Sequence, residues 1–449
     1  TFATGYKYAG MGYTTAFDAA VPPLAARHVH EEFEDTPVLD KGFFALVGNN
    51  HFAMRAIKEG DRRKLDSFLA WLLTASKAYA PKLVNPGGVE MWKQRARGDV
   101  SGFDDRVDGF DVTPRQIVTE IAAAANRLGL PHPVHIHTNR LGMPGNWRTT
   151  LETMQALDGL RSHLTHIQFH SYDGGDADES TFGSKVPELA AWVNAHPELT
   201  VDVGQVLFGP TTSMTGDGPL GHYLSRLYGT KWFSGDVEME AGCGIAPIRY
   251  KDTSLVHALQ WAIGLEWYLL IDDPWQVAMS TDHPNGGSFL AYPHIIRLLM
   301  DRSFRDEVLA GLPEQVRQRS VLADLRREYS LQEICIITRA GPAKMLGLDR
   351  KGHLGIGADA DITVYAPDEN RQTMFETPRW VLKGGEVVIE GGEIRAVAAG
   401  STLHVRVAYD HEIEPTIARW FDDAYSVRFR NYPVTDEDVP RPLPIDART

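Results

Sequence analysis

The chain has 449 residues, of which 43% are hydrophobic, and its formal net charge is −14. This size allows one large domain and a smaller one around a buried core, and the acidic balance argues against nucleic acid or an anionic membrane surface as the main partner. The two cysteines, Cys243 and Cys335, provide neither a thiolate metal site nor a disulfide framework, which favours a reducing, cytoplasmic compartment.

Short apolar runs alternate with helical segments through the first three quarters of the chain. Seven runs are predicted as strands, at residues 12–18, 43–47, 82–85, 134–137, 166–169, 200–206 and 277–280. Segments predicted as helices lie at 114–128, 185–194 and 255–267. The alternation predicts parallel strands with crossover helices, hence an α/β fold of the (β/α)8 TIM-like barrel type over residues 1–335. Only seven barrel strands can be counted, so the first strand is apparently missing.

The pattern changes near residue 336. Residues 340–348 close a helix, residues 355–365 turn into a strand, and residues 381–392 form a strand-turn-strand with glycine at the turns. These segments predict a small β domain over residues 336–430. Residues 431–449 are rich in Pro, Asp and Arg without periodicity, so we expect an extended arm that clasps a partner, or else a frayed terminus.

Side chains suited to metal binding lie on or just after four successive predicted strands: Lys82, His135 or His137, His170, and Asp282. Barrel enzymes carry their chemistry at the carboxyl ends of the strands. Imidazole and carboxylate bind zinc well, and a neutral lysine amine can take up carbon dioxide to give a carbamate that bridges two metal ions. Because zinc brings the pKa of a bound water near 7, the pattern predicts a metal-dependent hydrolase.

The choice among the histidines depends on their place along each predicted strand. His135 and His137 share one face of a strand, so both can point to the barrel axis, and His137 is preferred because it lies closer to the carboxyl end. The sequence leaves open which of the two is the ligand. For the same reason His170 is preferred over His166, which is assigned to the core.

Longer strings resemble the amidohydrolase superfamily across nearly the whole chain. They include Gly-Tyr-Thr-Thr at 12–15, Pro-Ala-Lys-Met-Leu-Gly-Leu at 342–348 and Gly-Ala-Asp-Ala-Asp-Ile at 357–362. Within the superfamily, the strings at 82–88, 135–146 and 168–172 are similar to the A subunit of formylmethanofuran dehydrogenase. They are also similar to its bacterial relative in the formyltransferase/hydrolase complex of methylotrophs.

The resemblance implies roles for individual residues. Lys82 would be the carboxylated lysine bridging two zinc ions, with His137 or His135 and His170 on one ion, and Asp282 on the other as proton shuttle. The candidates for substrate contacts are His51, Asn85, Asn139 and His283.

One part of the superfamily pattern is not in the sequence. The opening His-x-His should precede residue 12, and without it the first metal site would be incomplete. The string His28-Val29-His30 has the same spacing but a helical context, in which residues two apart diverge by about 200°. It is therefore not predicted to bind metal.

The implied reaction is hydrolysis of formylmethanofuran or formylmethylofuran to formate and the free amine, with methanofuran or methylofuran as the formyl carrier. The implied partners are a molybdopterin-enzyme-like subunit together with a formyltransferase subunit. The Ala- and Arg-rich composition leans towards the bacterial hydrolase. The alternatives are the archaeal A subunit, which would condense formate with methanofuran, a non-catalytic scaffold subunit, and a cyclic amidohydrolase of the dihydropyrimidinase kind.

Overall fold

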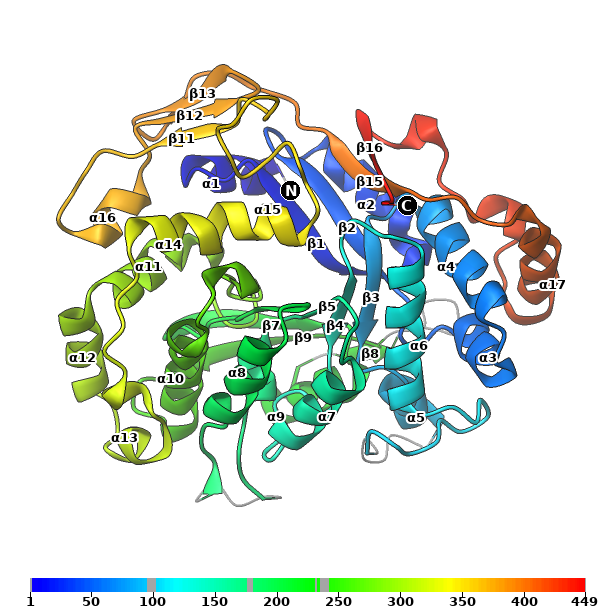
Figure 1. Ribbon diagram of the computed structural model, residues 1–449, viewed down its shortest axis with the longest axis horizontal. Helices are drawn as coiled ribbons and strands as arrows, with labels where there is room; N and C mark the ends of the chain where they lie inside the picture. Colours follow the sequence, from blue (N-terminus) through cyan, green and yellow to red (C-terminus); the bar gives the residue numbers. More distant parts are fainter. Residues whose placement is uncertain (1, 95–101, 176–180, 231, 235–241, 449) are drawn as a thin grey trace.

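The computed structural model describes residues 2–94, 102–175, 181–230, 232–234 and 242–448. Its centre is a nine-stranded sheet that curves into an open α/β barrel with helices on the outside (Figure 1). The strand order is β10-β6-β5-β4-β3-β2-β15-β16, with β1 also beside β2. The bounds are β1 Thr15–Val21, β2 Asp40–Leu46, β3 Ala80–Val84, β4 Val134–His137, β5 Ser162–Leu164, β6 Leu199–Asp202, β10 Val277–Ala278, β15 Thr402–Arg406 and β16 Pro442–Asp446.

All pairings in this sheet are parallel, as the alternation of strands and helices predicts. Every residue of β2, β3 and β4 is buried, which fits strands covered on both faces. Within the described residues β1 pairs only with β2, and β10 pairs only with β6, so the barrel is open between β10 and β1. This confirms the predicted barrel fold, in which six of the seven strands predicted from the sequence are present: β1, β2, β3, β4, β6 and β10.

The helices surround the barrel, and the three predicted from the sequence are present as α6, α8 and α10. Helix α6 begins with a capping box in which Thr113 and Gln116 satisfy each other's backbone N–H groups. No described helix is both long and apolar enough to cross a membrane. The bounds are α1 Phe2–Gly10, α2 Ala26–Glu34, α3 His51–Glu59, α4 Arg62–Ser76, α5 Gly88–Gln94, α6 Pro114–Arg127, α7 Trp147–Ala156, α8 Val186–Ala195, α10 Leu255–Leu270, α11 Tyr292–Met300, α12 Arg302–Ala310, α13 Gln315–Arg319, α14 Leu331–Cys335, α15 Gly341–Met345, α16 Arg371–Glu376 and α17 Glu414–Ala424.

The strand predicted at 166–169 is wrong. Strand β5 ends at Leu164, and residues Ile167–His170 form a 3-10 turn. His166 between them has a positive φ of 36°, and its backbone N–H donates to Asp202 Oδ1 at 3.1 Å. This contact from β6 turns the chain out of the extended conformation.

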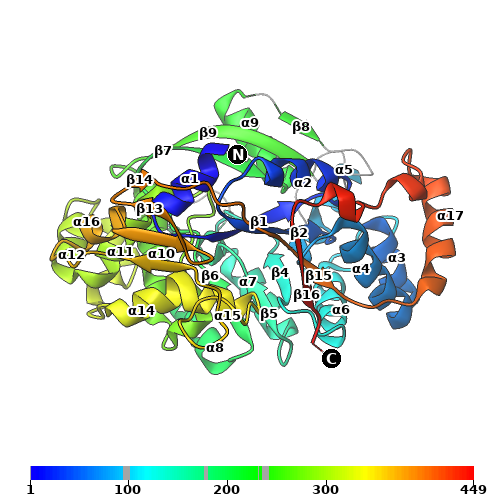
Figure 2. The same ribbon diagram turned by 90° about the horizontal axis from the view of Figure 1, so that it is seen from above.

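A segment between β6 and α10 forms structure that the sequence analysis did not predict. It contains β7 Gly209–Thr215, α9 Gly218–Tyr228, β8 Trp232–Ser234 and β9 Gly242–Tyr250. The strands pair antiparallel in the order β7-β9-β8. Figure 2 places this sheet and α9 along one side of the molecule, with α8 and α15 on the opposite side.

The small β sheet is antiparallel, in the order β11-β12-β13-β14, with bounds β11 Ile362–Val364, β12 Trp380–Lys383, β13 Glu386–Glu390 and β14 Glu393–Ile394. Strands β15 and β16 lie outside it, because they join the main sheet. The last segment therefore packs on its own chain. Strand β16 pairs with all five residues of β15, and Val434 N donates to Ala75 O at 2.7 Å.

Buried ion pairs join the small sheet to the barrel. Asp361, in the Gly-Ala-Asp-Ala-Asp string, accepts from Lys351 Nζ at 2.9 Å and from Lys383 Nζ at 2.7 Å. Both lysines also contact Asp40 at the start of β2, at 2.6 and 2.5 Å. All four side chains are at most 9% exposed. Removing the Asp361 carboxylate would leave two buried ammonium groups sharing Asp40, with Asp359 3.1 Å from Lys351 Nζ as the remaining partner.

We therefore expect Asp361→Asn to lower the free energy of unfolding by about 3–5 kcal/mol, the range for a broken buried ion pair. Denaturant unfolding of the variant against the wild type would measure this. Asp368→Asn, at an exposed position in the same part of the chain, is the matched control and should change stability by less than about 0.5 kcal/mol. Equal stabilities for the two variants would contradict a joining role for Asp361.

Glu266 is a fully buried carboxyl group on α10. It accepts hydrogen bonds from Val321 N at 2.6 Å, Leu322 N at 3.2 Å and the Ser184 hydroxyl. Burial nevertheless raises the pKa of Glu266 from 4.5 to about 7. Folding therefore favours the protonated form.

The raised pKa gives a pH dependence with a defined sign. Below pH 4.5 Glu266 is protonated in both the folded and the unfolded chain, and as pH rises to about 7 only the unfolded chain releases the proton, which costs stability. Glu266→Gln has no such proton. Its free energy of unfolding should therefore gain up to about 3 kcal/mol relative to that of the wild type between pH 4.5 and 8.

Denaturant unfolding at several pH values would measure this gain, with exposed Glu307→Gln as the control. If the stabilities of Glu266→Gln and the wild type change with pH in parallel, the raised pKa of Glu266 is refuted.

Candidate metal-binding active site

A cavity of about 300 Å³ opens at the carboxyl ends of the barrel strands. The polar groups at its floor are Lys82, His137, His166 and Asp282. Much of its wall comes from the segment 209–250, through side chains that include Leu220, Tyr223, Leu224, Tyr228, Ile248 and Tyr250. The cavity thus combines an apolar wall with a small set of convergent polar groups, the usual composition of a small-molecule site.

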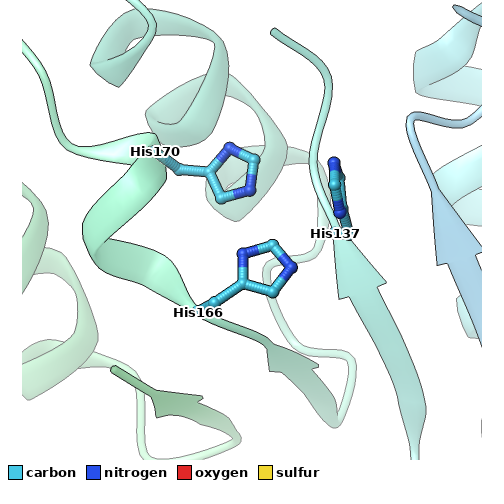
Figure 3. Close-up of side chains that lie close together, drawn as sticks. All are labelled: His137, His166 and His170. Carbon is cyan, nitrogen blue, oxygen red and sulfur yellow. The ribbon is translucent and has the colours of Figure 1, made fainter. Parts of the chain in front are cut away.

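Three buried histidines lie close together, and two of them, His137 and His166, line this cavity (Figure 3). His137 ends β4, His166 follows β5, and His170 lies in the 3-10 turn. One ring nitrogen of each lies within 4.8 Å of the others. Burial lowers the pKa of all three imidazoles. The rings are therefore neutral, which is the form that binds metal ions.

Hydrogen bonds leave ring nitrogens available for a metal ion. His170 Nδ1 contacts the Thr138 hydroxyl at 2.8 Å. This contact orients the ring and leaves its Nε2 for another partner. Within the part of the chain that the structure describes, His170 Nε2 and His166 Nδ1 are buried without a hydrogen-bond partner. A buried polar atom without a partner is costly, and a divalent cation would satisfy both nitrogens. The residues therefore fit a metal centre.

Lys82 lies on β3, in register with His135 of β4, and is 2% exposed. Burial lowers the pKa of its amine to about 7, a shift that Asp202 and Asp282 partly oppose. Among the described residues, no hydrogen bond or ion pair reaches its Nζ atom. About half of such an amine is uncharged at pH 7, and the uncharged amine is the form that reacts with carbon dioxide.

Asp282 follows β10 in a left-handed turn with φ of 48°. Burial at the cavity floor and the negative charge of Asp202 raise the pKa of Asp282 to about 8, against the effect of Lys82. Asp202 lies behind this pair at the end of β6 and accepts a hydrogen bond from the Ser280 hydroxyl. A carboxyl group that titrates near neutral pH can both take up and release a proton.

His135 lies one layer deeper in the barrel than His137. Its Nδ1 contacts His132 Nε2 at 3.1 Å, and its ring stacks on that of His163 at 4.7 Å. His135, His163 and Asp202 form a second group of closely spaced ligand atoms. His163 Nε2 contacts Asp202 Oδ2 at 3.1 Å, whereas His135 Nε2 is buried without a hydrogen-bond partner among the described residues. His137 is the member of the predicted pair that faces the cavity.

None of the four residues expected to contact substrate lines the cavity: His51, Asn85, Asn139 and His283. His51 Nε2 lies 3.1 Å from Glu90 Oε2, and Asn139 donates to Asn85 Oδ1 at 2.7 Å. His283 is exposed. Substrate contact stays a prediction for these residues. His28 and His30 lie on α2, as their context predicted, and His30 contacts Ser76 O at 3.1 Å.

Three residues at the site were not predicted as site residues from the sequence: His166, which was assigned to the core, Asp202 and Asp217. Asp217 belongs to the segment 209–250, and its Oδ2 lies 3.2 Å from His137 Nε2. The string Asp217-Gly218-Pro219 is a helix-start signature that could have located α9. Nothing in the sequence would have indicated that this helix start reaches a histidine 80 residues away.

Comparison with known proteins defines the class. A family model described as the amidohydrolase family matches residues 1–389, and the chain belongs to this family.

Within the family, the chain is 45% identical to protein FwdA of Methanocaldococcus jannaschii, over 97% of this chain and 80% of that protein. It is 37% identical to the A subunit of the formyltransferase/hydrolase complex Fhc of Methylorubrum extorquens, over 97% of this chain and 80% of that protein. The crystal structure of the FhcABCD complex from the same bacterium, solved with methylofuran, contains a chain that matches with a TM-score of 0.94 and 36% identity. This match covers 99% of the present chain and 82% of that chain.

We expect Lys82→Ala to lose bound metal, with partial recovery when a short carboxylic acid is added, because an acid can replace the two oxygens of a carbamate. Metal content per chain, measured by elemental analysis, would test this. Lys41→Ala is the matched control, since Lys41 is another buried strand lysine whose Nζ donates to Thr36 O at 2.7 Å outside the cavity. Full metal content in Lys82→Ala would rule out the bridging role.

Proposed function

We propose that the chain hydrolyses the amide bond of a formylated furan amine, formylmethanofuran or formylmethylofuran, to formate and the free amine. The observation that carries the proposal is the convergence of Lys82, His137, His166 and Asp282 at one cavity, with His170 beside the two histidines. The substrate class rests on similarity to the Fhc protein and to the chain from a complex solved with methylofuran.

Two zinc ions are the proposed cofactor. Lys82 as carbamate, together with His137, His166, His170 and Asp282, would hold them. When bound, the ions would polarise the formyl oxygen and lower the pKa of a water molecule to about 7. The proposed ligand set adds His166 to the residues inferred from the sequence and leaves His135 in the deeper layer.

The protein residues have separate tasks in this reaction. Asp282 takes a proton from the attacking water and gives it to the leaving amine, for which a carboxyl group titrating near neutral pH is suited. The apolar wall from β7, α9 and β9 excludes bulk water and accommodates the non-reacting part of the substrate. Asp202 holds the turn that carries His166 through the 3.1 Å hydrogen bond to its backbone.

The reverse reaction is the second candidate. Hydrolysis and condensation share one transition state, so the same site could also condense formate with methanofuran. We propose that a molybdopterin-enzyme-like subunit, together with a formyltransferase subunit, sets the direction. The similarity to a chain of the FhcABCD complex supports a multisubunit setting.

Asp282→Asn tests the proposal. It preserves side-chain shape but cannot shuttle a proton, so formate release from a formylated furan amine should fall by about 10²–10⁴-fold. Metal content is measured in parallel, because Asp282 is also a proposed ligand. Asp273→Asn, which changes an exposed turn before β10, serves as the control. If the rate of formate release falls less than about threefold in Asp282→Asn, Asp282 has no catalytic role. If the wild-type complex neither hydrolyses nor forms formyl amides, the proposed function is refuted.

A further inference from the structure

Asp217 connects the cavity wall to the metal-binding histidines. Its side chain is 3% exposed, and it begins α9, whose residues Leu220, Tyr223 and Leu224 line the cavity. Oδ2 lies 3.2 Å from His137 Nε2. Oδ1 accepts from Asn85 Nδ2 at 3.1 Å and from Leu220 N at 3.4 Å.

These contacts determine which nitrogen of His137 carries hydrogen. A carboxylate only accepts hydrogen bonds, so His137 Nε2 must donate to Asp217. Because a neutral imidazole has one N–H, the lone pair of His137 is then on Nδ1, which has no hydrogen bond among the described residues. Carboxylate partners of this kind fix the orientation and hydrogen position of metal-binding histidines.

The partner atoms of Asp217 are themselves held in place. Asn139 Nδ2 donates to Asn85 Oδ1 at 2.7 Å and to Pro86 O at 3.0 Å, which keeps the Asn85 Nδ2 group turned towards Asp217. The backbone N–H of Asn85 donates to His137 O at 3.0 Å. Asp217 lies in the segment between β6 and α10. Its carboxylate therefore contacts Asn85, just after β3, and His137, at the end of β4.

We propose that Asp217 is a positioning residue: it directs His137 Nδ1 to the metal centre and thereby couples metal binding to the order of α9, the wall of the cavity. The inference rests on the proposed metal-dependent function. Since coupling between two sites is reciprocal, metal binding should stabilise α9, and the carboxylate that caps α9 should tighten metal binding.

Asp217→Asn isolates this role. Asn caps helices about as well as Asp, so α9 should still form. Asn85 Nδ2 and Leu220 N both require an acceptor at the Oδ1 position, so the new amide would point its NH2 group at His137 Nε2. That donor favours hydrogen on Nδ1, the wrong form for binding metal. Asp61→Asn, at the cap of α4 where Oδ1 accepts from Lys64 N at 2.9 Å, is the matched control.

Two measurements on the full chain, purified with its partner subunits, test the proposal. Chelator competition with zinc should show affinity weakened about 10–100-fold in Asp217→Asn and unchanged in Asp61→Asn. Hydrogen exchange of residues 218–228 should slow when zinc is added to the wild type, but not when zinc saturates Asp217→Asn. If Asp217 only capped α9, Asp217→Asn would show the zinc affinity and the zinc-dependent hydrogen exchange of the wild type.

The outcomes separate this inference from the proposed function. Zinc affinity within threefold of wild type in Asp217→Asn, or the same zinc-dependent protection of α9 in both proteins, overturns the positioning role. Neither measurement uses a formyl substrate, so a wild type that binds zinc without hydrolysing or forming formyl amides would refute only the proposed function. A wild type that binds no zinc would refute both.

Discussion

The loss of solvation around Lys82 is the constraint on which the barrel interior depends. An ammonium group in this position is strongly disfavoured, so the amine exists partly uncharged, and the imidazoles around it are neutral for the same reason. Neutral groups cannot offset one another by ion pairing. Two of the imidazoles are instead oriented by hydrogen bonds, which Thr138 provides for His170 and Asp217 provides for His137. His166 Nδ1 has no such partner among the described residues.

The sequence predicts the site residues on the strands better than those in the loops. Lys82, His137 and Asp282 were predicted because short apolar runs mark buried parallel strands: Lys82 lies within β3, His137 ends β4 and Asp282 follows β10. His166 was assigned to the core instead, because its left-handed turn is set by Asp202, 36 residues further along. Contacts between distant residues leave no local pattern. For the same reason the sequence did not predict that residues 209–250 form the cavity wall. It also did not predict that β15 and β16 join the main sheet.

The Gly-Ala-Asp-Ala-Asp string illustrates the difference between recognising a motif and explaining it. The sequence supports only the recognition. In the structure Asp361 lies between two buried lysines and also accepts from Gly384 N at 2.9 Å, in the turn between β12 and β13. Asp40 of the barrel faces the same lysines, so four alternating charges join the two sheets. The motif is thus explained as an electrostatic contact between the small sheet and the barrel, made by residues that do not line the cavity.

The pairing of β15 with β2 has a consequence for how the chain is made. Lys41 meets Thr402, about 360 residues later in the sequence. At a synthesis rate of about 5–20 residues per second, the amino-terminal part of β2 waits roughly 20–70 s for its neighbour to leave the ribosome. An unpaired strand edge is a template for any other extended chain. During that interval Lys41 has β1 as a neighbour on one side, and the edge of β2 on its other side stays open.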